Sequence, residues 1–194
     1  FPLQSTTALG ILAALVAGCG GDDSNDPNRR VTVQFQAQVN GQNFVCGQTY
    51  SNIGVGQPGT YQVNDWRFYV HDIALVKADG SQQSLALDQD GVWQYKNVAL
   101  LDLRKDCGSG ALPTNAAVAG TVATDQYSGI CFKVGIPYEL NYINDATAPS
   151  PLNNSGMLWS WRAGRKFIRV DGIGDPANLK QSFVIHLEIG RAHV

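Results

Sequence analysis

Two histidines, His71 and His186, have the most specific chemistry in this 194-residue chain. Imidazole is the commonest metal ligand in proteins, and both imidazole and thioether ligands suit copper. Each histidine lies in an apolar stretch typical of a β-strand. Two such strands side by side, with a third ligand, could hold a copper ion. The alternative is that each histidine is simply packed and hydrogen-bonded in its strand.

Little else in the sequence points to catalysis. The chain lacks the motifs of serine hydrolases, zinc proteases, nucleotide-binding loops and dithiol redox proteins. Because the chain has so few credible histidines, general acid–base catalysis by histidine does not explain its function well. We predict that the protein is not an enzyme.

Residues 157–161 combine the methionine Met157 with two tryptophans, Trp159 and Trp161. Side chains alternate between the two faces of a β-strand, so these three would share one face. Composition alone favours an aromatic core cluster. A redox role for the tryptophans requires further evidence.

The N-terminus has the layout of a bacterial lipoprotein signal. A short apolar run ends at Cys19, and residues 20–28 contain no large apolar side chain. The run is too short to cross a bilayer, which takes about 20 residues. We predict that residues 1–18 are a signal peptide truncated at its start. Residues 19–30 would then be a lipidated Cys19 and a flexible tether, which places the protein in the cell envelope.

The C-terminus breaks the pattern of the strand before it. Residues 188–194 read Glu-Ile-Gly-Arg-Ala-His-Val, a heptapeptide that a common sequencing adapter can encode. We predict that this segment is non-native, so its histidine carries no functional weight. One domain then remains, over residues 31–187, long enough to bury its own core.

Cysteine usage agrees with an oxidising compartment, where disulfides persist. Setting Cys19 aside leaves Cys46, Cys107 and Cys131, an odd number. Cys46 and Cys107 lie beside glycines in turn-like segments and suit a bridge. A missing C-terminus could equally supply their partners. Cys131 lies in an apolar run typical of a buried core cysteine.

Composition and turn signals predict an all-β domain, an antiparallel sandwich or barrel-like fold with long loops. The net charge of -2 and a charged fraction of 15% argue against nucleic acid as a partner. Residues 51–60 and 137–156 are the expected long loops. The expected strands are residues 31–39, 42–46, 65–77, 84–87, 92–103, 121–123, 128–134, 157–161, 166–171 and 182–187.

Many of these stretches resemble the methanobactin-associated periplasmic copper-binding family, the MbnP-like domain. It is also described as the four-Cys member of a metal-linked protein pair. The order and number of the matching segments make the resemblance specific. They are residues 44–47, 67–70, 87–95, 98–102, 113–115, 134–141, 148–153, 156–161 and 166–167.

The resemblance implies a β-rich extracytoplasmic protein that binds copper. It also implies a partner, a di-haem cytochrome c peroxidase-like protein, which in characterised members oxidises a tryptophan of the copper protein to kynurenine. Kynurenine carries an amine and a ketone, and either could reach a metal. The candidates for this modification are Trp159 and Trp161, followed by Trp93.

The sequence departs from the family pattern at two points. Family members often have histidine after the asparagine that matches Asn141, and here that residue is Tyr142. If that histidine is a ligand, this chain has lost it or uses His71 instead. His186 fits the family's His-Leu-Gly segment, but Glu188 stands where glycine would follow. Two family cysteines usually lie beyond that break, which would account for the odd number.

We therefore expect a lipid-anchored, periplasm-facing copper-binding protein, with the outer membrane favoured because Gly20 follows the lipidated cysteine. The expected copper ligands are His186 and His71, with Met157 and a modified tryptophan nearby. Two other classes stay open. One is an envelope lipoprotein that binds a small organic ligand on the tryptophan pair. The other is a purely structural lipoprotein with an aromatic core.

Overall fold

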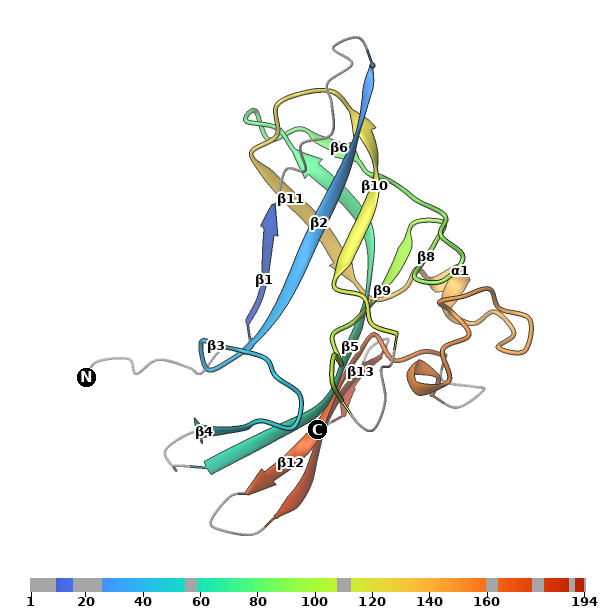
Figure 1. Ribbon diagram of the computed structural model, residues 1–194. Coiled ribbons are helices and arrows are strands. Elements are labelled where there is room, and N and C mark those ends of the chain that lie inside the picture. Colours follow the sequence, from blue (N-terminus) through green and yellow to red (C-terminus); the bar gives the residue numbers. More distant parts are fainter. Residues whose placement is uncertain are drawn as a thin grey trace.

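The computed structural model describes residues 10–15, 26–54, 59–107, 113–159, 164–175, 180–188 and 191–193, the first and last of these by their backbone alone. These residues form two antiparallel β-sheets packed against each other (Figure 1). The predicted all-β sandwich is therefore confirmed. None of the helices within these ranges is long and apolar enough to span a membrane.

The first sheet is built on the strand whose apolar and polar residues alternate most regularly, β2. The turn after it, Asn40-Gly41, has positive φ at both residues, 50° and 76°, as a tight hairpin requires. The return strand ends at Asn43, earlier than the predicted residue 46, and the chain then turns towards Cys46. The strands of this sheet are β1 (Gly10–Leu15), β2 (Asn28–Val39), β3 (Gln42–Asn43), β7 (Ala86–Leu87) and β10 (Ala117–Ala123).

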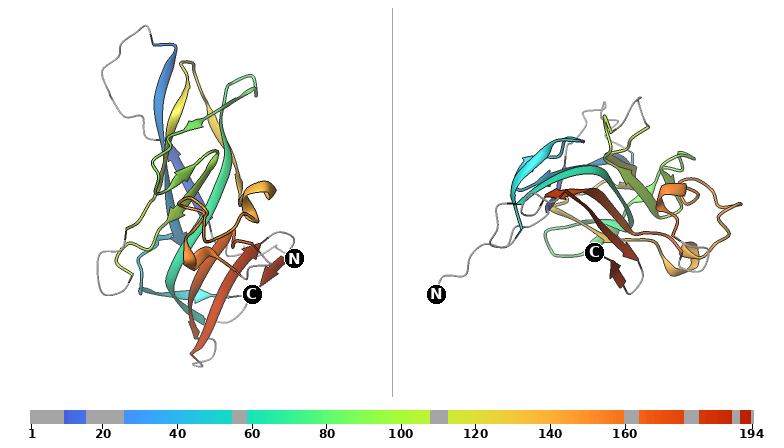
Figure 2. Two further views of the ribbon diagram at one scale, coloured as in Figure 1. Left: turned by 90° about the vertical axis from the view of Figure 1, so that its right-hand side faces the viewer. Right: turned by 90° about the horizontal axis from the view of Figure 1, so that it is seen from below.

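The second sheet is organised by one long strand, β5 (Gly59–Val76), which is rich in the aromatic and β-branched residues that favour strands. It runs along most of the molecule, with β12 beside one half and β11 beside the other (Figures 1 and 2). The other strands of this sheet are β4 (Thr49–Ile53), β6 (Gln82–Ser84), β8 (Gln94–Tyr95), β9 (Val98–Asp102), β11 (Gly129–Val134), β12 (Ile168–Asp175), β13 (Gln181–Glu188) and β14 (Arg191–His193).

Two further predictions of local structure are wrong. The loop predicted over residues 51–60 is shorter, because β4 continues to Ile53 and β5 begins at Gly59. The strand predicted over residues 157–161 is replaced, in its described part, by the end of a 3-10 turn, η1 (Ser155–Met157). The Asn154 side chain caps this turn by accepting a hydrogen bond from the Gly156 amide, at 3.2 Å. The turn includes Met157, and the extended conformation begins only at Leu158, which forms an isolated bridge with Arg165.

The two faces of β5 bury different cores. Trp66, Phe68 and Val70 face the first sheet and pack with the inward side chains of β2. Tyr69, on the opposite face, is covered by the long segment between β11 and β12, which carries α1 (Tyr138–Asn141) and η1. This segment turns an outer face of the sheet into a second core, and the side chains at its edge form the site described below.

A disulfide joins Cys46 to Cys107, as their turn-like settings indicated. It links the chain before β4 to the chain after β9. Cys131, expected in the core, is a half-buried free cysteine on β11.

We expect the Cys46→Ser, Cys107→Ser double variant to lose about 4 kcal/mol of unfolding free energy. The bridge spans 61 residues, and closing a loop of this length removes that much chain entropy from the unfolded state. Urea unfolding under oxidising conditions measures the loss. The Cys131→Ser control should lose less than about 1 kcal/mol, since no bridge is broken. A double variant as stable as this control would contradict the prediction.

Candidate functional site

The long segment that covers the outer face of β5 is held by one buried arginine, Arg165. Its side chain is 0% exposed. Its Nε donates to the Leu152 carbonyl at 2.6 Å, and its Nη1 donates to the Asn141 carbonyl at 2.5 Å. Its Nη2 lies 2.7 Å from the Asp145 carboxylate. One guanidinium thus fixes the two ends of the loop after α1.

The same anchoring positions a tryptophan. The Trp159 amide donates to the Gly164 carbonyl at 3.0 Å, and the Lys166 amide donates to the Met157 carbonyl at 2.8 Å. These bonds bring Trp159 to the edge of β13. Its indole meets the His186 ring edge-to-face, with ring centroids 5.3 Å apart and an interplanar angle of 86°. The Lys166 ammonium lies 4.8 Å from the indole centroid.

His186 is oriented from its other side by Asp171 on the neighbouring strand. The distance from His186 Nε2 to Asp171 Oδ1 is 2.6 Å. Burial alone would raise the pKa of Asp171, but hydrogen bonds from Arg169 and His186 outweigh it and hold that pKa below its usual value. The carboxylate is therefore ionised and accepts, so His186 Nε2 donates. In the neutral imidazole, this arrangement leaves Nδ1 with the lone pair that a metal would need.

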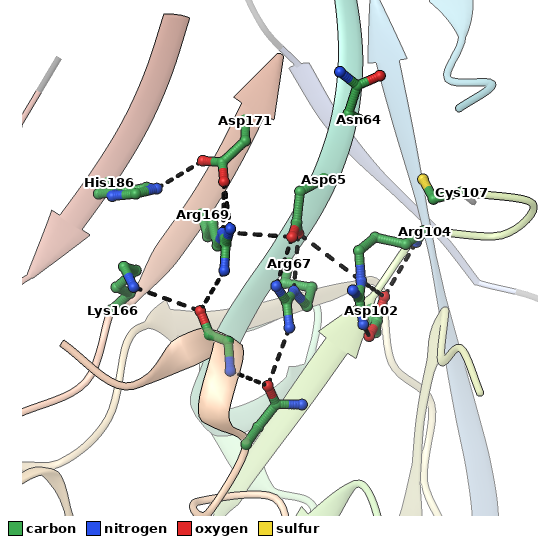
Figure 3. A network of polar contacts seen from close by, with 12 residues as sticks. Asn64, Asp65, Arg67, Asp102, Arg104, Cys107, Lys166, Arg169, Asp171 and His186 are labelled. Atoms are coloured by element: carbon green, nitrogen blue, oxygen red, sulfur yellow. Dashed lines mark hydrogen bonds and ion pairs between the residues drawn. The ribbon is translucent and has the colours of Figure 1, made fainter. Parts of the chain in front are cut away.

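A network of ion pairs extends from Asp171 across β12 to β5 (Figure 3). Arg169 Nη2 lies 2.6 Å from Asp171 Oδ2, and Arg169 Nε lies 3.4 Å from Asp65 Oδ2. The buried Asp65 also pairs with Arg67 at 2.5 Å and faces Arg104 at 3.9 Å. The network ties the strand that carries His186 rigidly to the centre of the sheet.

Burial also lowers the pKa of Lys166, the lysine beside Trp159, and the neighbouring Arg169 guanidinium lowers that pKa further. The Lys166 ammonium replaces part of the hydration lost on burial by donating a hydrogen bond to the Leu158 carbonyl at 2.8 Å. Lys166 is thus directed at the segment that carries Trp159.

The structure does not bring His71 to His186. In the sheet, Arg169 lies between His186 and Arg67, and His71 is four residues further along β5. This is about 13 Å along the strand at the usual rise per residue. The Nδ1 of His71 lies 3.1 Å from Asp72 but has no hydrogen-bond partner. Burial lowers the pKa of His71, which favours the neutral, metal-binding form.

The other predicted site residues are dispersed. Met157 is fully buried in the second core, and Trp93 packs against that core. Trp161 and Cys19 lie outside the described residues. Within the part of the chain that the structure describes, no three His, Cys, Asp or Glu side chains gather as a metal site would require. Among the predicted copper ligands and tryptophans, the described residues show one histidine in ring contact with a tryptophan, His186 with Trp159.

The sequence analysis missed the ion-pair network, although it leaves a signal. Aspartate and arginine are two residues apart in four places, and where both lie in one strand the alternation puts them on one face. The bonded pairs are Asp65 with Arg67, Asp102 with Arg104, and Arg169 with Asp171.

Comparisons with known proteins agree with the sequence resemblance. A family model described as MbnP matches residues 28–193. Among solved structures, MbnP from Methylosinus trichosporium matches with a TM-score of 0.66 and 30% sequence identity. The match covers 82% of this chain, and this chain spans 62% of that protein. A comparison with curated proteins gives no match.

Proposed function

Because this chain belongs to the MbnP family, we propose that it is a copper-binding protein of the bacterial envelope that serves copper acquisition or handling. Copper is its cargo, and Cys19 carries the lipid that anchors it to the membrane. A di-haem cytochrome c peroxidase-like protein is its partner and oxidises one of its tryptophans to kynurenine. The chain is the substrate of that oxidation and is not itself an enzyme.

The contact between Trp159 and His186 carries this proposal. A tryptophan that becomes a copper ligand must be accessible to the oxidant and must lie beside another ligand. Trp159 is 37% exposed and touches an imidazole, whereas Trp66 is 1% exposed within the main core. Trp93 packs against the second core, and among the described residues it makes no ring contact with a histidine.

The chemistry of the donor set fits copper. Asp171 holds His186 in the tautomer that offers Nδ1, the carboxylate–histidine arrangement that orients metal ligands elsewhere. Nitrogen ligands of this type suit copper. Opening the Trp159 indole would add an aryl amine and a ketone beside that imidazole. The described residues offer too few ligands before this change, and the modification would supply the next one.

Native mass spectrometry of the full protein, co-produced with the haem partner and supplied with copper, tests the proposal. We expect bound copper together with an oxidised tryptophan that peptide fragmentation assigns to Trp159. His186→Gln should abolish copper binding because it removes the imidazole. The matched variant His71→Gln should retain copper. His71 lies on β5 four residues beyond Arg67, the residue that is level with His186 in the sheet. A copper-free protein with every tryptophan intact would overturn the proposal.

A further inference from the structure

Beside the His186 site, three arginines line an open depression of about 560 Å³. Arg67 comes from β5, Arg169 from β12 and Arg104 from the chain after β9. Asp65 lies at its base, and η1 forms another wall through Ser155 and Gly156. Side chains from four separate segments therefore converge on one concave surface.

The lining of this depression contains more guanidinium than carboxylate groups. Three guanidiniums line it against one carboxylate, Asp65. The carboxylates that balance the others do not line it: Asp102 is buried against Arg104, and Asp171 is turned towards His186. An anion that enters the depression therefore contacts guanidinium groups, while Asp102 and Asp171 balance two of these groups from outside the lining.

The guanidiniums also keep unused hydrogen-bond donors. Each guanidinium carries five N–H donors. Arg104 donates from Nε at 2.8 Å and from Nη2 at 2.6 Å, both to Asp102, and among the described residues its Nη1 has no acceptor. Arg169 commits one Nη1 donor to the Gly156 carbonyl at 2.8 Å. The donors that remain need an acceptor from outside the chain or from water.

The depression is preorganised. Arg67 is 4% exposed and is fixed between Asp65 and the Asn154 amide oxygen, at 2.5 Å and 3.0 Å. Its guanidinium lies so close to Gly156 that any side chain at that position would collide with it. Little conformational freedom is left to lose when a ligand binds, which favours affinity.

We propose that this depression binds a small oxyanion ligand of the carboxylate or phosphate type. The planar fork of a guanidinium pairs with two oxygens of such a group at once. The site is separate from copper binding, since neither His186 nor Trp159 lines it. Its test therefore uses the copper-free protein and does not depend on the function proposed above.

NMR spectra of the copper-free protein, titrated separately with citrate and inorganic phosphate at constant ionic strength, test this proposal. We expect saturable shifts of the Arg104 and Arg169 Nε–H signals and of the Ser155 and Gly156 amides. The anion whose titration saturates at the lower concentration, citrate or phosphate, identifies the preferred type of ligand. The Nε–H of Arg30, an exposed arginine paired with Asp88, should show no saturation. Shifts no larger than those with chloride in both arms would overturn the proposal.

A paired variant adds a second test. Arg104→Gln with Asp102→Asn removes a cation and its own counter-ion together, so no buried carboxylate is left unpaired. We expect at least tenfold weaker binding of the preferred anion. The matched control, Arg30→Gln with Asp88→Asn, removes an ion pair on the first sheet and should bind normally. Unchanged core amide shifts would show that the fold is intact, and unchanged affinity in that folded variant would overturn the proposal.

Discussion

A Trp159→Phe variant produced with the haem partner and copper should contain no kynurenine and should bind copper at least tenfold more weakly. Phenylalanine keeps an aromatic ring against His186 but cannot yield the amine and ketone of an opened indole. The contact at 5.3 Å between the Trp159 and His186 rings is the reason to expect that both losses occur together. Peptide mass spectrometry and a competition assay with a copper chelator measure them.

Trp93→Phe is the matched control for this experiment. Trp93 is half-buried against the second core and is the remaining candidate among the described tryptophans of the sequence analysis. Its variant should keep both kynurenine and copper affinity. Kynurenine that persists in Trp159→Phe and maps to Trp161 would transfer the role to that residue. Kynurenine that disappears in Trp93→Phe alone would contradict the assignment.

Replacing Arg165 with alanine should lower the unfolding free energy by about 3–5 kcal/mol, because several buried carbonyls lose their hydrogen-bond donor. The loss is large because the guanidinium serves several carbonyls that are otherwise buried without donors, including those of Leu140, Asn141 and Leu152. An unsatisfied buried polar group costs about 1–3 kcal/mol. Asp145 would also lose its cation.

Thermal and urea unfolding measure this effect. The melting temperature should fall by roughly 10 °C, given the usual entropy of unfolding for a domain of this size. Arg30→Ala is the matched control, because its side chain is 69% exposed and its loss should cost less than about 1 kcal/mol. An Arg165→Ala protein with control-like stability would show that the loop does not depend on this residue.

The sequence predicted the local structure well where a short-range rule decides it. Alternation over residues 31–39 and the Asn-Gly turn placed β2 and its hairpin, because strand period and positive φ are properties of neighbouring residues. It was less successful near residue 157, where the turn capped by Asn154 includes Met157 and the extended conformation begins only at Leu158. It also missed α1, a single short turn within the predicted loop.

The candidate site was predicted only as a set of residue types. The sequence by itself determined that His186 and several tryptophans were present, and that Cys46 and Cys107 suit a bridge. Which tryptophan meets His186 was decided by the tertiary structure. That contact depends on how β13 pairs with β12 and on the loop held by Arg165.

The physical reason is the range of the interactions. Strand pattern and turn chemistry act between residues a few positions apart, so a sequence shows them directly. The Asp65 network joins strands separated by about a hundred residues, and its geometry exists only after those strands have paired in register. Charge balance, burial and the neighbours of a tryptophan are set by that pairing and by the loop that closes over it.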